Sequence, residues 1–454
     1  MTSKVMASGA ASLGSLPSRS VSPTKIFALV KGREGPHREK PGTSYCATLM
    51  HLLKGSIGTG IFAMGRAMKN AGLALGPSGL VFLGMMNLYC QHQLVTAADQ
   101  VAFNHDYNVK PDYAETVMVG FMDGPERTRN LCFIMKKLVN FMLVLTEMGF
   151  CCVYVVFMAH SLDKILRIYN IVRFSTRILI LFTLLPIWLM CFLNNLKVLV
   201  PASILANVVT LSGILITLYY NLVKIPDPWR LPLLADWSKI PLFFGTALFS
   251  FEAIGLVLPM YNEVKSTKQF SAWYGILNVG MIIVIIVNSL VGVTSYIKWG
   301  EDVLASVTLN LPAEEEELAQ AVVILIAISV AFTYLLQMYV AFMILFPWVY
   351  RRYGPFRYPY LVEMLFKSML TLIAYTFAIA NPYLEEFITL VGAIGGTSLA
   401  LIFPPLLEMV TFYETLGYFT IFKNILILLL GFTGIITGTY TACREIVIKI
   451  TEGE

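Results

Sequence analysis

Charged residues are scarce in this sequence. Only 13% of the 454 residues are charged and 57% are hydrophobic, whereas about 25% of the residues in an average globular domain are charged. So few charges cannot cover the surface of a water-soluble fold of this size, and the mean hydropathy is high, at +0.71. The composition therefore excludes an ordinary soluble domain and predicts a protein whose solvent is the lipid bilayer.

The motifs of enzymes, of metal sites and of nucleic-acid binding are also missing. The seven cysteines include no CxxC pair, so neither a zinc site nor a disulfide framework is indicated. We find no phosphate-binding loop and no nucleophile motif. The net charge of +5 is not gathered in a long basic stripe with interleaved aromatic residues. We therefore expect no enzymatic activity, no cofactor, no bound metal and no nucleic-acid partner.

The first 43 residues differ from the rest of the chain. They are rich in Ser, Gly and Pro, and they carry seven Lys and Arg residues against two Glu residues. This composition predicts a disordered basic tail over residues 1–43, and the positive-inside rule places that tail and the N-terminus in the cytosol. We expect the plasma membrane as the location, with the lysosomal membrane as the alternative.

Long apolar runs fill the remaining chain, residues 44–454, which we interpret as one polytopic transmembrane domain. A helix that crosses about 30 Å of hydrocarbon needs roughly 20 apolar residues. The fold class expected is therefore all-α and integral to the membrane, with eleven spans. They cover residues 44–66, 75–103, 131–161, 176–193, 197–223, 240–261, 272–299, 317–346, 360–380, 383–410 and 421–443.

Two of these spans contain a predicted interruption. Span one includes the run from Gly55 to Gly60, in which three glycines each weaken a helix by about 1 kcal/mol relative to Ala. Span six places Glu252 in the apolar run 249–255, and a charge at that depth is costly. Interruptions at corresponding places in two halves indicate an inverted-repeat transporter. We predict a 5+5 repeat, with halves 44–223 and 240–410 and broken helices 1 and 6, plus an extra C-terminal helix, 421–443.

Several local motifs resemble one known family. They are His51 to Gly60, Lys69 to Gly72, Gly149 to Tyr154, Phe249 to Glu252, Thr308 to Pro312, Phe403 to Glu408 and Gly438 to Tyr440. In this order they closely resemble the proton-coupled amino acid transporter family, within the amino acid/auxin permease superfamily. The resemblance implies eleven helices, ten of them in an inverted repeat, and co-transport of small neutral amino acids with protons.

An amino acid is a zwitterion, so its site must replace water at both charged ends. Backbone N–H groups near Gly58 to Gly60 can hold the carboxylate, and unwound carbonyls around Phe249 to Phe251 can accept from the ammonium group. Side chains in the resembling segments would set the size of the substrate. The substrate-site candidates are Gly55, Ser56, Gly58, Thr59, Gly60, Cys151, Tyr154, Phe249, Ser250 and Phe251.

For the proton, the leading candidate is His51, because its free pKa near 6.5 lies in the physiological range and because the resemblance implicates it. Glu252 and Glu147 are the other intramembrane acids, and Glu147 could instead pair with Lys54. Where the family usually has a proline after the first broken helix, this chain has Gly65 followed by Arg66. We expect Arg66 to be solvated or to face lipid headgroups.

Two other functions remain open from the sequence. The same fold could serve as a uniporter or a sodium symporter, since one sequence cannot display a cluster of sodium ligands. The chain could also be a nutrient sensor that binds an amino acid with little flux. A test of whether a pH gradient or a sodium gradient drives accumulation would separate the first alternative from proton-coupled transport. Binding of amino acid without measurable uptake would indicate the sensor.

Overall fold

The structure is a computed structural model. It describes residues 43–107, 109–170, 174–191, 196–251, 253–313 and 316–452, with side chains from residue 206 onward in the fourth range. The predicted tail therefore lies outside the described residues except for Thr43, and the proposed proton carrier Glu252 lies outside them as well.

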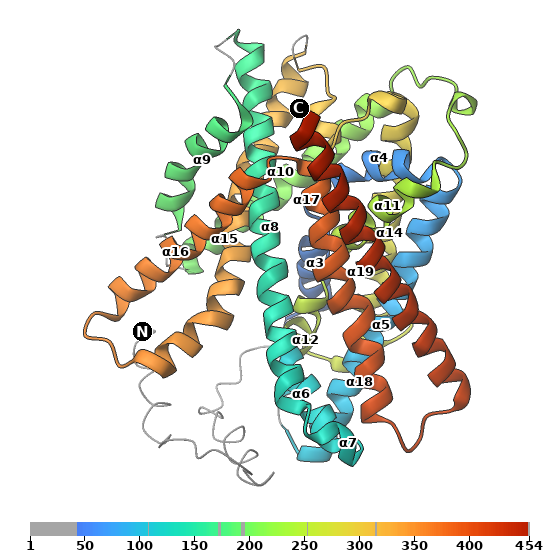
Figure 1. Ribbon diagram of the computed structural model, residues 1–454, viewed down its shortest axis with the longest axis vertical. Coiled ribbons are helices and arrows are strands. Elements are labelled where there is room, and N and C mark those ends of the chain that lie inside the picture. The colour runs from blue at the N-terminus through green and yellow to red at the C-terminus, as the bar shows by residue number, and fades with distance from the viewer. Residues whose placement is uncertain are drawn as a thin grey trace.

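The described chain is helical, and its only β feature is an isolated parallel bridge between Thr43 and Val264. Figure 1 shows most helices running roughly parallel to the long axis of the molecule. The principal helices are α3 (Tyr45–Ser56), α4 (Gly60–Ala71), α5 (Leu75–His105), α6 (Tyr113–Asp123), α7 (Glu126–Arg129), α8 (Cys132–Ile168), α9 (Thr176–Met190), α10 (Leu196–Leu222), α11 (Ile240–Ser250), α12 (Ile254–Glu263), α13 (Thr267–Ser271), α14 (Ile276–Trp299), α15 (Glu317–Tyr353), α16 (Pro359–Ala380), α17 (Leu384–Val391), α18 (Phe403–Thr411) and α19 (Tyr418–Glu452).

Short helical turns connect these helices. Two π-helical turns, η5 and η6, join α17 to α18, and the remaining four are 3-10 turns. Their bounds are η1 (Pro228–Arg230), η2 (Trp237–Lys239), η3 (Gly300–Asp302), η4 (Val307–Leu309), η5 (Gly392–Gly396) and η6 (Ser398–Ile402).

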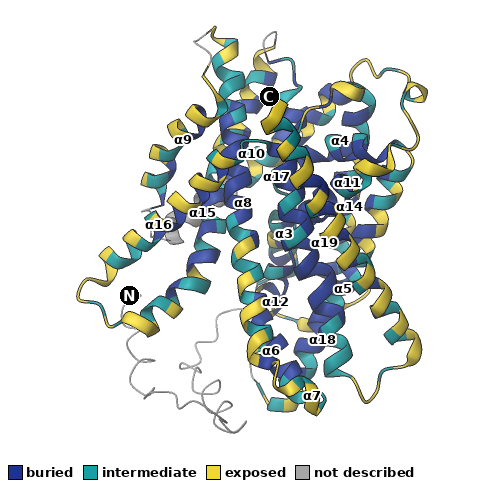
Figure 2. Cartoon of the chain, viewed as in Figure 1, coloured by how far each residue is buried: buried dark blue, intermediate teal, exposed yellow. Residues whose placement is uncertain are grey.

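Length and hydropathy identify the membrane-crossing segments. Seven segments of the described chain are long and apolar enough to cross a membrane, and two further apolar helices, Thr176–Met190 and Ala206–Leu222, are shorter. Large hydrophobic side chains such as Leu365 on α16 and Phe432 on α19 are exposed, and exposed residues line the outer surfaces of these helices (Figure 2). An all-helical membrane fold is thus confirmed, while the count of eleven spans and the inverted repeat stay predictions.

Both predicted interruptions are present. Helix α3 ends at Ser56 and α4 begins at Gly60, while α11 ends at Ser250 and α12 begins at Ile254. At the first interruption Ile57 leaves the helical region, with φ −101° and ψ 86°. The glycine-rich run favours this because glycine stabilises a helix less than any residue except proline.

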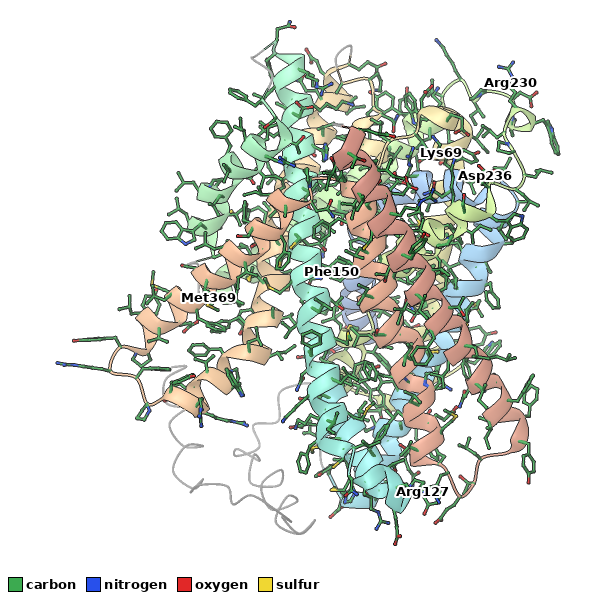
Figure 3. All side chains as sticks on the ribbon, viewed as in Figure 1. Lys69, Arg127, Phe150, Arg230, Asp236 and Met369 are labelled. Carbon is green, nitrogen blue, oxygen red and sulfur yellow. The ribbon has the colours of Figure 1, made fainter. Side chains whose placement is uncertain are left out.

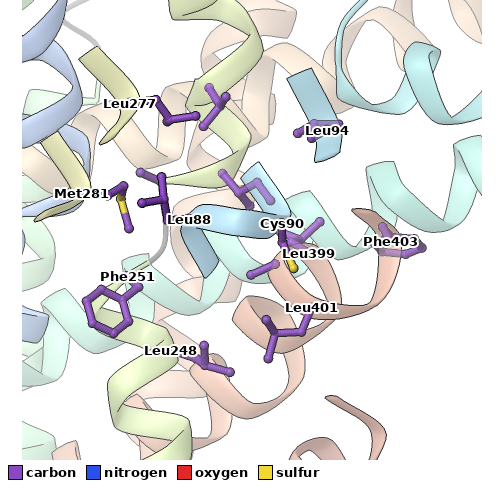
Figure 4. Packing of buried hydrophobic residues seen from close by; sticks show 14 of the residues in the cluster. Leu88, Cys90, Leu94, Leu248, Phe251, Leu277, Met281, Leu399, Leu401 and Phe403 are labelled. Carbon is purple, nitrogen blue, oxygen red and sulfur yellow. The ribbon is translucent and has the colours of Figure 1, made fainter. Parts of the chain in front are cut away.

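Close packing holds the second broken helix against its neighbours. The Phe251 ring lies so near α5 that a methyl group added at Gly84 would be 3.0 Å from its Cζ. Figure 4 shows Phe251 and Leu248 of this segment facing the same buried cluster as Leu401 of η6. The second interruption is therefore packed against α5.

Burial differs sharply between the two halves of each broken helix. Ten of the twelve residues of α4 are buried but only three of the twelve in α3. Likewise nine of eleven residues are buried in α11 and five of ten in α12. Helices α4 and α11 lie beside α17 toward the upper end in Figure 1. We call this the closed end, because most residues of α4 and α11 are buried against neighbouring helices, whereas fewer residues of α3 and α12 are buried.

Candidate functional site

The two interruptions lie directly against each other. A methyl group added at Gly60 would be 2.8 Å from Ser250 Cα and 3.1 Å from Phe249 Cδ1. A methyl group added at Gly55 would be 2.6 Å from Leu256 Cδ1 on α12. Only glycine fits at these two positions without displacing a neighbour, so the sequence brings the backbones of both broken helices together.

The first interruption leaves backbone donors free. The N–H groups of Gly58, Thr59 and Gly60 have no hydrogen-bond acceptor within the described part of the chain. They stand at the N-terminus of α4, where helix dipoles concentrate about half a positive charge. Such an arrangement is suited to an anionic group.

The second interruption leaves backbone acceptors free. The carbonyl oxygens of Phe249 and Ser250, in the last turn of α11, accept no hydrogen bond from any residue that the structure describes. A helix C-terminus carries partial negative charge, so this end is suited to a cation. The two free ends therefore offer charges of opposite sign at adjacent positions.

Phe251 contributes no free group to the contact between the two interruptions. Its carbonyl already accepts from Asn87 Nδ2 at 3.0 Å and from the Ala253 N–H at 2.9 Å, and its ring is fully buried, at 0% exposure, in the core beside α5. The contribution of Phe251 to the substrate site therefore stays a prediction, with its carbonyl and ring already held by protein groups.

Two asparagines hold the second interruption in place, and neither was predicted from the sequence. Asn87 of α5 binds the Phe251 carbonyl, and Asn288 of α14 accepts from Ser250 Oγ at 2.5 Å while its own amide donates to the Val284 carbonyl at 2.9 Å. Both side chains are buried. A buried polar residue in an apolar span is itself a signal of function or of a specific partner, and that signal could have found them.

Helix α8 supplies an aromatic wall. The Phe150 ring centroid is 4.7 Å from that of Phe249 and 6.1 Å from that of Tyr154, and a methyl group at Gly58 would be 3.7 Å from the Tyr154 hydroxyl. In Figure 3 Phe150 lies at middle height, between Lys69 at one end and Arg127 at the other. The wall is thus at the depth of the interruptions.

Cys151, a predicted substrate contact, faces away from this wall. Its Sγ lies 3.9 Å from the Tyr334 carbonyl of α15, and its side chain is fully buried. Residues four apart share a helix face and adjacent residues do not. Phe150 therefore lies on the same face of α8 as Tyr154, whereas Cys151 lies on another face. The i,i+4 spacing of Phe150 and Tyr154 could have identified Phe150 from the sequence.

Two buried polar atoms of α8 and one at the first interruption lack hydrogen-bond partners among the described residues. Among the described residues, Thr59 Oγ1, Thr146 Oγ1 and Glu147 Oε2 are buried and accept or donate no hydrogen bond. Thr146 lies one helical turn before Phe150 and so shares its face. Ser56, by contrast, donates to the Leu52 carbonyl at 3.0 Å within its own helix, so its hydroxyl already has one partner. Unsatisfied polar groups are costly unless a ligand or water completes them.

The two candidate proton carriers that the structure describes, His51 and Glu147, differ in exposure, since Glu147 Oε2 is buried. His51 is exposed on α3, on the side away from the closed end. No ion pair joins Glu147 to Lys54 in the part of the chain described, which corrects the alternative that these two residues form a structural pair. The described residues also contain no cluster of three or more His, Cys, Asp or Glu able to hold a metal ion.

Arg66 was expected to be solvated, and that prediction is wrong. Its Nε donates to Glu385 Oε2 of α17 at 2.7 Å, and its Nη1 donates to the Val303 carbonyl at 3.1 Å. The reason is that α4 packs against α17 at the closed end, so a carboxylate is available where the sequence suggested only water or headgroups.

Comparison with known proteins identifies the family of this chain. A sequence profile of the family described as "Transmembrane amino acid transporter protein" matches residues 41–444. The chain belongs to this family. The transporter is therefore an integral multi-pass membrane protein that carries amino acids, and it is not an enzyme.

Two relatives cover most of the transporter. A Drosophila melanogaster protein named "Proton-coupled amino acid transporter-like protein pathetic" is 33% identical over 432 residues, or 94% of this chain and 89% of the relative. The Caenorhabditis elegans "Probable amino acid transporter skat-1" is 25% identical over 420 residues, or 89% of this chain and 90% of its own. A crystal structure of a mutant manganese transporter from Eremococcus coleocola, 13% identical, covers 88% of this chain and 94% of its own with a TM-score of 0.45.

Proposed function

We propose that this transporter moves small neutral amino acids together with protons by alternating access. It would use eleven spans, ten of them in a 5+5 inverted repeat, in the plasma membrane or the lysosomal membrane, with the N-terminus in the cytosol. One observation carries the proposal: free N–H groups at residues 58–60 lie against free carbonyls at residues 249–250. The name of the Drosophila relative supports proton coupling.

The two free ends match the groups of an amino acid. The carboxylate would bind the N–H groups at the start of α4, and the ammonium group would bind the carbonyls at the end of α11. The substrate side chain would then face Phe150, Phe249 and Tyr154. Aromatic rings beside the two interruptions favour a small uncharged side chain.

Alternating access requires that the site open to one side at a time. The uneven burial of the two broken helices supports alternating access. Most residues of α4 and α11 are buried, whereas α3 and α12 have fewer buried residues. Segments with few buried contacts are the ones that move at low cost. We infer that substrate leaves past α3 and α12 when the opposite end is closed.

The proton would be carried by ionisable groups beside the first interruption. His51 lies four residues before Gly55, and Glu147 Oε2 is buried without a partner among the described residues. Glu252 is proposed as a further proton carrier because it lies in the apolar run 249–255 of span six. An intramembrane acid or histidine of this kind is a common proton relay in transporters.

Reconstituted vesicles test the proposed function directly. We expect an inward pH gradient to drive accumulation of radiolabelled alanine or glycine, and an equal sodium gradient without a pH gradient to drive none. Charged amino acids such as lysine should compete poorly. Accumulation driven only by sodium would contradict proton coupling, and substrate binding without uptake in any gradient would contradict transport and indicate a sensor.

His51→Ala is expected to abolish accumulation driven by a pH gradient while exchange of alanine for alanine continues. The reason is that exchange needs the substrate site but no net proton movement. The control is His92→Ala, which removes a histidine that bonds Asn278 Oδ1 at 2.6 Å, away from the interruptions. Undiminished uphill uptake in His51→Ala would exclude this residue as a proton carrier.

A further inference from the structure

The closed end contains two adjacent buried carboxylates that the substrate site does not use. Glu385 and Glu386, at the start of α17, are 8% and 3% exposed. Glu385 Oε2 accepts from Arg66 at 2.7 Å, and Glu385 Oε1 accepts from Asn70 Nδ2 at 2.9 Å. Both oxygens of Glu385 are thus held by α4.

Glu386 is held by a different helix. Lys449 Nζ of α19 donates to Glu386 Oε1, while Glu386 Oε2 is buried without a partner in the described chain. The four residues form a neutral set, in which Arg66 and Lys449 balance the two glutamates. We call it the charge cluster.

The surroundings supply few other charges. On α8, the His160 ring nitrogen lies 3.1 Å from the Pro382 carbonyl, and Arg167 pairs with Asp163. Lys164, also on α8, donates to the carbonyl oxygens of Leu309 and Leu311. On α4, Lys69 pairs with the exposed Glu301. Helix α11 and η5, which also pack against α17, contain no ionisable side chain.

The two cations of the charge cluster, Arg66 and Lys449, belong to different helices. Arg66 and Asn70 lie one turn apart on the same face of α4, directly beyond the first interruption. Lys449 belongs to α19, outside both broken helices. In an opening that separates α4 from α17, Arg66 would leave Glu385 while Lys449 would stay beside Glu386. The two adjacent carboxylates are then left with one cation, and repulsion between two like charges at one site favours protonation of one of them.

We propose that Glu385 is a proton-binding site of the transport cycle, ionised and paired with Arg66 when this end is closed and protonated when it is open. On opening, one proton from water on that side binds a Glu385 carboxylate oxygen and restores neutrality to the cluster. On closing, Arg66 pairs with the carboxylate again, and the displaced proton passes to the neighbouring Glu386 Oε2, which is buried without a partner in the described chain, and from there toward the interruptions. Proton binding therefore favours the open state, and one proton enters per cycle. The inference rests on the proposed function.

The test uses the full-length protein in vesicles, with radiolabelled alanine as substrate. Glu385→Gln keeps the shape of the side chain but cannot titrate. We expect this variant to retain alanine exchange within about threefold and to lose at least tenfold of the accumulation driven by a pH gradient. Glu301→Gln, which removes the exposed partner of Lys69 at the same end, should retain both activities.

The outcomes separate the two proposals. Accumulation by Glu385→Gln equal to that of the unmodified protein would overturn the role of Glu385 and leave the proposed function standing. Absence of alanine exchange in the unmodified protein would contradict the proposed function itself. A purely structural role for Glu385 would reduce exchange and accumulation in parallel, which would also overturn the inference.

A second variant covers the case in which Glu385→Gln does not fold. Glu385→Asp keeps a titratable group but shortens its reach to Arg66, so the ionised form is less stabilised when this end is closed. The pH that gives half-maximal accumulation should therefore rise. An unchanged pH dependence in Glu385→Asp would overturn the assignment.

Discussion

Gly58→Ala is expected to raise the KM for amino acid uptake roughly tenfold, which corresponds to ~1.4 kcal/mol of binding free energy. The protein itself has room for the extra methyl group, since its nearest contact would be the Tyr154 hydroxyl at 3.7 Å. The methyl group would instead occupy space beside the free N–H groups of residues 58–60. Loss of affinity would therefore report on the substrate and not on packing.

Two further glycines make this experiment decisive. Gly417 has no atom within 4 Å of an added methyl group, so Gly417→Ala should behave like the unmodified protein. At Gly60 the methyl group would be 2.8 Å from Ser250 Cα, so Gly60→Ala should lower the melting temperature, because overpacking typically costs about 1–3 kcal/mol. The measurements are initial uptake rates in vesicles and thermal unfolding in detergent. An unchanged KM in Gly58→Ala would exclude the backbone site.

Arg66→Met is expected to destabilise the closed end by about 3–5 kcal/mol, the usual cost of breaking a buried ion pair from one side. The methionine removes the cation but keeps the length of the side chain, so Glu385 stays buried with only Asn70 as partner. Protonation of Glu385 would relieve that charge. The melting temperature of Arg66→Met should therefore rise as the pH is lowered from 8 to 6, by more than that of the unmodified protein.

A double-mutant cycle isolates the contribution of this pair. Arg66→Met combined with Glu385→Met removes both charges, and the doubly substituted protein should be more stable than Arg66→Met alone, with a coupling energy on the order of 0.5–3 kcal/mol. Lys69→Met is the matched control, since its partner Glu301 is 66% exposed and exposed pairs contribute about 1 kcal/mol or less. Additive effects of the two substitutions would show that Arg66 and Glu385 do not interact energetically.

The sequence by itself determined the helical segments and where two of them are interrupted. Runs of apolar residues long enough to cross a membrane leave the backbone no alternative to helix, and the glycines of residues 55–60 weaken the helix locally. Both properties depend on neighbours within a few positions of the chain. The predicted interruptions accordingly match the ends of α3 and α11 and the starts of α4 and α12.

Only the tertiary structure decided which side chains face the gap and which charges meet. The rotation of α8 turns Phe150 toward Phe249 and Cys151 toward Tyr334, and an amide on α5 occupies the Phe251 carbonyl. Arg66 finds Glu385 across 319 residues of sequence. A local pattern shows which residues share a helix face, such as Phe150 and Tyr154. Which neighbour that face meets depends on how all the helices pack together, and no local pattern specifies that packing.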